Sequence, residues 1–157
     1  MLYSVLKLVH LLSIIVWVGG MVFAHFFLRP AVAETVEVAG LRIRLMDAVL
    51  KRFFAGVTLS VVLVVGSGVW MIGRMARMAA QTGGHFSMSL SWTLMATLGL
   101  VMVAIFGHIR FALFKRLRRA TNASDWPTAG KALAGIRTWV GINLALGLAT
   151  VAVALLV

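Results

Sequence analysis

Residues 5–28 read VLKLVHLLSIIVWVGGMVFAHFFL, a run of mostly apolar side chains that ends at Arg29-Pro30. A helix needs roughly 20 consecutive apolar residues to cross the hydrocarbon core of a bilayer, so this run predicts a membrane-spanning helix. Two histidines, His10 and His25, lie inside the run, about four turns apart along a helix. Because ionisable side chains are costly inside a membrane, both histidines are candidate functional residues.

The composition of the whole chain also indicates a membrane protein. Its 157 residues are 62% hydrophobic and only 12% charged, with a mean hydropathy of +1.03, whereas soluble domains are roughly half apolar and a quarter charged. The chain has no cysteine, which excludes disulfides, Cys-ligated zinc, iron–sulfur clusters and a thiol nucleophile. The net charge of +11 does not indicate nucleic-acid binding, because the basic residues flank apolar runs as they do in membrane proteins.

Three further apolar runs are long enough to span a bilayer, and we expect an all-α integral membrane bundle of four helices running up and down. The predicted spans are at about residues 5–28, 53–72, 90–109 and 139–156. We expect polar segments between them, namely a connector in the 30s and 40s, the Ala79–Ser89 loop and a connector at 115–135. Such connectors predict antiparallel neighbours and a single domain over residues 1–157.

The basic residues predict how the bundle is oriented. All of the 15 Lys and Arg residues except Lys7, Arg74 and Arg77 fall on the side of the first and third connectors. Cytoplasmic loops carry such an excess of Lys and Arg, so this side is predicted to face the cytoplasm. Both termini and the Gly83-Gly84-His85 loop are then expected in the periplasm, outside a bacterial-type inner membrane.

His25 and His108 are predicted at a similar depth near the cytoplasmic boundary, on two parallel helices. Parallel helices are diagonal in an up-down bundle, so the two imidazoles can face each other across its centre. Paired imidazoles suit axial ligation of a b-type haem, and Arg29, Arg52 and Arg110 are available to bind its propionates. Alternatively, each histidine hydrogen-bonds a neighbouring helix or extends toward the interface.

His10 is expected in the outer half of the first helix, on the same face as Met21. A metal site at this depth would need a second ligand, and His85 in the outer loop is the other histidine on that side. The alternative is a buried histidine that is hydrogen-bonded to Ser67, Asn143 or another polar group. The sequence leaves both interpretations open.

Methionines near the outer end of the second span offer ligands for copper. Met71, Met75 and Met78 recur at helical spacing, and His85 follows them. Thioethers and imidazoles are soft ligands that select Cu(I). Against this, Arg74 and Arg77 lie between the methionines and would repel a cation, and methionine in a membrane helix is usually a packing residue. The full set of candidate metal ligands is His10, Met21, His25, Met71, Met75, Met78, His85 and His108.

Several short motifs together resemble a known family. They are Lys7-x-x-His10, Trp17-x-Gly19-Gly20, Arg29-Pro30, Arg52-Phe53, Gly66-Ser67-Gly68-x-Trp70 and His108. The set resembles the CopD copper-resistance membrane domain and is similar to its relative HemJ, a haem-associated protoporphyrinogen oxidase with four helices. The CopD resemblance implies copper uptake across the inner membrane, and the HemJ resemblance implies a role for His10 in haem binding or catalysis. HemJ-like sequences carry an Asn-Glu pair early in the last helix, whereas Asn143 is followed by Leu144 here, which argues against protoporphyrinogen oxidation.

Three functional hypotheses follow from the sequence. The first is a b-type haem protein for electron transfer, with a redox partner or quinone, which could act as a haem-dependent oxidoreductase. The second is copper handling or uptake through His and Met ligands. The third is a packing subunit without a cofactor. All three involve contact with membrane lipid and are compatible with a homo-oligomer.

Overall fold

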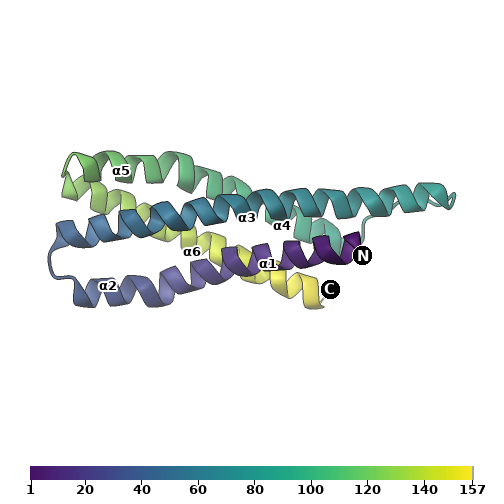
Figure 1. Ribbon diagram of the computed structural model, residues 1–157, viewed down its shortest axis with the longest axis horizontal. Helices are drawn as coiled ribbons and strands as arrows, with labels where there is room; N and C mark the ends of the chain where they lie inside the picture. The colour runs from purple at the N-terminus through teal and green to yellow at the C-terminus, as the bar shows by residue number, and fades with distance from the viewer. Residues whose placement is uncertain (157) are drawn as a thin grey trace.

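The computed structural model describes residues 1–156, and every regular element in that range is a helix. The elements are α1 (Leu2–Phe23), the π-helical turn η1 (Ala24–Leu28), α2 (Arg29–Thr35), α3 (Ala39–Gln81), α4 (Leu90–His108), the π-helical turn η2 (Ile109–Leu113), α5 (Phe114–Asn122) and α6 (Trp126–Leu156). Elements α1 to α2 are continuous, as are α4 to α5, so the chain forms four helical rods (Figure 1). All four rods are long and apolar enough to cross a membrane, which confirms the predicted all-α membrane bundle.

The rods run antiparallel in chain order. Both termini lie toward the end of the molecule where α3 finishes, and α3 projects beyond the start of α1 there (Figure 1). We call this the terminal end. The opposite end contains α2, α5 and the beginnings of α3 and α6, and we call it the basic end because most of the Lys and Arg residues lie there.

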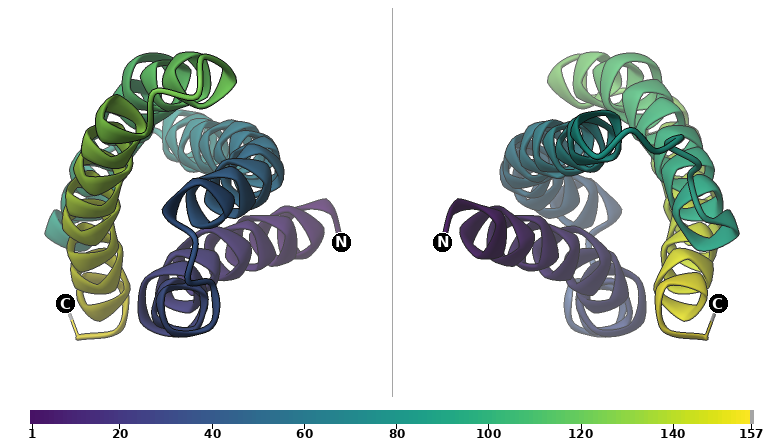
Figure 2. Two further views of the ribbon diagram at one scale, coloured as in Figure 1. Left: turned by 90° about the vertical axis from the view of Figure 1, so that its left-hand side faces the viewer. Right: turned by 90° about the vertical axis from the view of Figure 1, so that its right-hand side faces the viewer.

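The four rods associate as two pairs. α1 packs along α3, while α6 packs along both α4 and α5. Figure 2 shows α4, α5 and α6 forming one side of the molecule, with α1 and α3 on the other side. The pairs are joined because α6 also contacts α1 and α3.

Aromatic side chains fill the centre where the pairs meet. Phe54 of α3 contacts Phe106 of α4 and Phe114 of α5 edge to face, with ring centroids 5.9 and 5.2 Å apart. Phe106 in turn contacts Trp17 of α1 at 6.0 Å. Edge-to-face aromatic pairs contribute about 0.5–1.5 kcal/mol each beyond the area that they bury. The four rings therefore connect three of the four rods through one continuous core.

The helices extend much further at the basic end than the sequence interpretation allowed. We expected connectors in the 30s and 40s and at residues 115–135, but only residues 36–38 and 123–125 lie outside helices there. For the second connector the reason is packing, because α5 lies against α6 and buries Phe114, Leu117 and Ala120 despite its polar composition. The start of α6 is also capped, since the backbone N–H of Thr128 donates to Asp125 Oδ1 at 3.1 Å.

The sequence explains the first π-helical turn through Pro30, and a histidine lies in or beside each of the two turns. Pro30 has no N–H, so the carbonyl four residues before it loses its α-helical partner. Directly upstream, the N–H of Arg29 bonds to the Ala24 carbonyl in the wider π pattern. The second turn, η2, follows His108, as the first contains His25. π-Helical turns are rare in proteins, but those that occur are often found at functional sites. The positions of His25 and His108 are therefore consistent with a functional role.

Candidate functional sites

His10 is held against α3 by a specific hydrogen bond. Its Nδ1 lies 2.8 Å from Ser67 Oγ, and both residues lie within the paired helices α1 and α3. A β-carbon at Gly68 would lie 3.5 Å from His10 Cε1, so the ring packs directly on the glycine backbone. Of the two interpretations offered by the sequence, the hydrogen bond to Ser67 is present.

The bonds around Ser67 determine which His10 nitrogen is available. Ser67 Oγ donates to the backbone carbonyl of Leu63, one turn earlier in α3. Since its hydrogen is used there, the hydroxyl oxygen accepts from His10 Nδ1–H. The other ring nitrogen, Nε2, then carries no hydrogen and keeps a lone pair. A histidine fixed in this way by an outer hydrogen bond is the usual arrangement for a metal ligand.

The methionine and arginine residues of α3 lie beyond His10, toward the terminal end. Met71 is one turn after Ser67, on the same helix face and half-buried. The guanidinium of Arg74 lies over the rings of Tyr3 and Trp70, 5.6 and 5.7 Å from their centroids. The Arg74 contact with Tyr3 places this face of α3 toward α1. Along α3, Met71 therefore lies between Ser67, the partner of His10, and Arg74.

The remaining outer candidates are more dispersed. Met75 and Met78 are exposed on the part of α3 near its end, and His85 is exposed in the loop after α3. Met21, by contrast, is 2% exposed in the aromatic core. Met71 is one helical turn from Ser67, the partner of His10, whereas Met21, Met75, Met78 and His85 are not gathered around one point.

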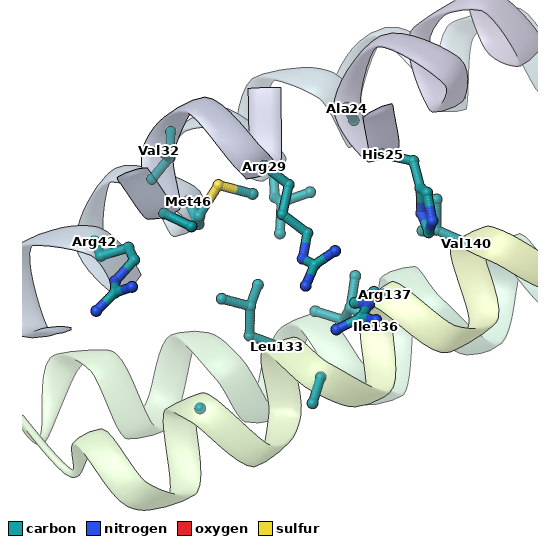
Figure 3. Close-up of a pocket in the computed structure, with 14 residues that line it drawn as sticks. Ala24, His25, Arg29, Val32, Arg42, Met46, Leu133, Ile136, Arg137 and Val140 are labelled. Atoms are coloured by element: carbon teal, nitrogen blue, oxygen red, sulfur yellow. The ribbon is translucent and has the colours of Figure 1, made fainter. Parts of the chain in front are cut away.

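His25 lies in a pocket near the basic end, formed between the α1–η1–α2 rod and α6. Its Cε1 would lie 3.5 Å from a β-carbon at Gly141 of α6. Figure 3 shows His25 and Arg29 both extending from their rod toward α6, where Arg137 lies. The lining residues are Ala24, His25, Arg29, Val32, Ala33, Arg42, Met46, Leu50, Gly130, Leu133, Ala134, Ile136, Arg137 and Val140.

His108 occupies a different environment from His25. It is exposed, and its ring packs edge to face against Trp139 of α6, with centroids 5.3 Å apart. No contact joins it to His25 within residues 1–156, and it does not line the His25 pocket. The contacts place the two histidines at different sides of α6.

The three arginines predicted to bind haem propionates also separate. Arg29 lines the His25 pocket. Arg52 donates to the Ala48 carbonyl of its own helix at 3.3 Å. Arg110 stacks over Phe111 and Phe114, 5.9 and 5.4 Å from their ring centroids. Only one of the three is therefore beside a candidate histidine.

Three polar residues that the sequence did not single out as site residues, namely Asp47, Thr121 and Asn143, each have a buried side-chain oxygen without a hydrogen-bond partner in the described chain. Asn143 of α6 is 1% exposed, and its Oδ1 has no hydrogen-bond partner within the described chain. Asp47 of α3 has one buried oxygen in the same condition. In residues 1–156, no cluster of three or more His, Asp or Glu side chains is arranged to hold a metal ion.

These features define the class of the protein: a multi-pass, all-α membrane protein whose apolar helices contact lipid. The family model of copper resistance protein D (CopD) matches residues 47–157, and the chain belongs to this family. No curated protein and no solved structure matches the chain. The family match covers Ser67 and Met71 but not α1, which carries His10 and His25. The predicted relation to HemJ stays a prediction.

Proposed function

We propose that the protein handles copper within the membrane and takes Cu(I) as its cargo at the α1–α3 contact, with His10 Nε2 as the principal ligand. The observation that carries the proposal is the hydrogen bond from His10 Nδ1 to Ser67 Oγ. It orients the imidazole and leaves Nε2 free to bind a soft cation. Membership of the CopD family supports copper as the metal.

The ligand chemistry near His10 suits the reduced ion. Cu(I) prefers thioether and imidazole donors, and the Met71 thioether is one helical turn from Ser67. The chain has no cysteine, and none of its four acidic residues falls within a predicted span. A hard cation such as Ca²⁺ or Mg²⁺ would find no carboxylate there. The donor set therefore fits Cu(I) better than it fits a hard divalent ion.

The positive charge of Arg74 favours reversible binding of copper over its long-term storage. Its guanidinium is held near the same face by Tyr3 and Trp70, and it repels a bound cation. A site that combines soft donors with a neighbouring positive charge binds Cu(I) less tightly than the donors alone would. Lower affinity allows release, which a protein that passes copper onward requires.

The excess of basic residues at the opposite end supports an orientation for this site. Under the positive-inside rule the basic end faces the cytoplasm, so the His10 half faces the periplasm of a bacterial-type inner membrane. Copper would then be taken from the outer side. An enzymatic reaction is not required by this proposal.

The test is a Cu(I) titration of the protein purified in mild detergent, against a colorimetric Cu(I) chelator. We expect the His10→Ala variant to bind Cu(I) more than about a hundredfold more weakly, because removal of a ligand exceeds the 10–100-fold effect of losing its outer partner. His85→Ala is the matched control, since His85 is exposed in the loop. Equal affinity of His10→Ala and the unmodified protein would contradict the proposal.

A b-type haem remains a second hypothesis, and one observation favours it. His25 and Arg29 line the same pocket, as an axial ligand and a propionate partner would. The second predicted ligand, His108, packs on Trp139 and is exposed. Protein isolated from cells supplied with haem and copper distinguishes the hypotheses, because a haem protein has a Soret absorption band that His25→Ala removes. If the isolated protein contains no copper and shows no Soret band, the result favours the hypothesis of a packing subunit without a cofactor.

A further inference from the structure

The pocket beside His25 has features that the copper proposal does not use. Its volume is about 280 Å³, and it opens between the α1–η1–α2 rod, the beginning of α3 and the first half of α6. Figure 3 shows side chains from both walls extending into this space. The pocket is thus built by segments that are distant in the sequence.

Three arginines from three different rods line this pocket. They are Arg29 of α2, Arg42 of α3 and Arg137 of α6, and no carboxylate is among the lining residues. None of the three forms an ion pair anywhere in residues 1–156. Like charges that line one pocket without a counter-charge repel each other, and an anion bound between them would relieve that repulsion. Guanidinium groups bind phosphate with paired, charge-assisted hydrogen bonds.

The rest of the lining is apolar. Leu133, Ile136 and Val140 follow one face of α6, and Met46 and Leu50 face them from α3. The pocket begins beside His25 and Val140, within the predicted spans, and extends to Arg42, beyond them. It therefore crosses the level at which the lipid headgroups meet the hydrocarbon of the bilayer. A ligand that fits has an anionic head and an apolar tail.

From this arrangement we infer that the pocket binds an anionic phospholipid of the leaflet at the basic end. The phosphate lies between Arg29 and Arg137, one acyl chain lies along Leu133, Ile136 and Val140, and Arg42 adds positive charge at the far end of the pocket (Figure 3). A free phosphate ion would satisfy the arginines but not the apolar wall, so the lipid is the better match. The inference does not depend on the copper proposal, because it concerns the opposite end of the molecule.

The test measures lipid binding to the full chain in a neutral detergent by native mass spectrometry and thermal unfolding. Phosphatidylglycerol should bind and raise the unfolding temperature, while phosphatidylcholine and inorganic phosphate should have much smaller effects. Arg29→Gln and Arg137→Gln should each weaken phosphatidylglycerol binding about tenfold, since each removes a charge-assisted contact. Arg116→Gln is the control, because Arg116 is an exposed residue of α5 outside the pocket.

A second variant fills the pocket without changing its charge. A β-carbon at Gly130 meets nothing within 4 Å, so the Gly130→Leu side chain begins in open space at the pocket lining and is designed to fill it. We expect it to weaken phosphatidylglycerol binding while the protein remains folded by circular dichroism. The inference is overturned if Arg116→Gln weakens binding as much as the pocket variants do. It is also overturned if phosphatidylcholine or inorganic phosphate binds as well as phosphatidylglycerol, or if Gly130→Leu binds normally.

Discussion

His10 and His25 lie on one continuous helical rod, yet their surroundings differ in every respect that matters for chemistry. His10 is fixed by Ser67 between two closely packed helices. His25 lies in an open pocket with three arginines. The first setting fixes the orientation of one imidazole, on which the copper proposal rests, whereas the second places three arginines in one pocket, on which the lipid inference rests. Two histidines in one apolar run therefore lie in two different surroundings.

The largest effect is expected where the rod is held between the two histidines. A β-carbon at Gly20 would overlap the Phe53 ring of α3, whereas one at the neighbouring Gly19 meets nothing within 4 Å. Small residues allow membrane helices to approach closely. Gly20→Leu should lower the free energy of unfolding by about 1–3 kcal/mol through overpacking. Denaturant unfolding in detergent measures this, and Gly19→Leu should remain close to the unmodified protein. Equal losses in both variants would show that the close contact is not specific.

A second prediction alters the His10 site alone. Ser67→Ala removes the acceptor of His10 Nδ1–H, so the ring is no longer held in one tautomer and orientation. The Cu(I) affinity should fall about 10–100-fold, as it does when outer partners of metal-bound histidines are lost. Ser60→Ala is matched to it, because Ser60 is equally buried on α3 but has no bond to His10. If both variants bind Cu(I) with similar affinity in chelator competition, Ser67 does not orient His10 for copper binding.

The smallest effect concerns charge at the basic end. Hydrogen bonds from Thr128 lower the folded-state pKa of Asp125, which lies between α5 and α6. Its contribution to stability is therefore present at neutral pH and is lost as the pH falls through the lowered pKa. Asp125→Asn should lower the unfolding temperature slightly at neutral pH and have no such effect in strong acid. An unchanged unfolding temperature for Asp125→Asn at neutral pH would contradict this assignment.

The four rods could be predicted from the sequence because hydropathy depends on local composition. Each predicted span lies in one rod, and the expected inward face of the first helix is present, with Trp17 and Met21 buried. The helical extensions at the basic end could not be predicted in the same way. In the second of them, α5 is polar in composition and is stabilised by contacts with α6 that only the tertiary structure creates.

The sites were predictable to different degrees. The bond between His10 and Ser67 was one of two open interpretations, because the sequence indicates depth but not which helices become neighbours. The arginine pocket was not predictable, since Arg29, Arg42 and Arg137 come from three rods. Helical periodicity says nothing about how far one rod lies from another.

Copper K-edge X-ray absorption of the Cu(I)-loaded protein tests the central claim most directly. The account predicts imidazole scattering together with sulfur scattering in the unmodified protein. The imidazole component should disappear in His10→Ala and remain in His25→Ala. An imidazole component that survives in His10→Ala, or that disappears only in His25→Ala, would contradict the assignment of the copper site to His10.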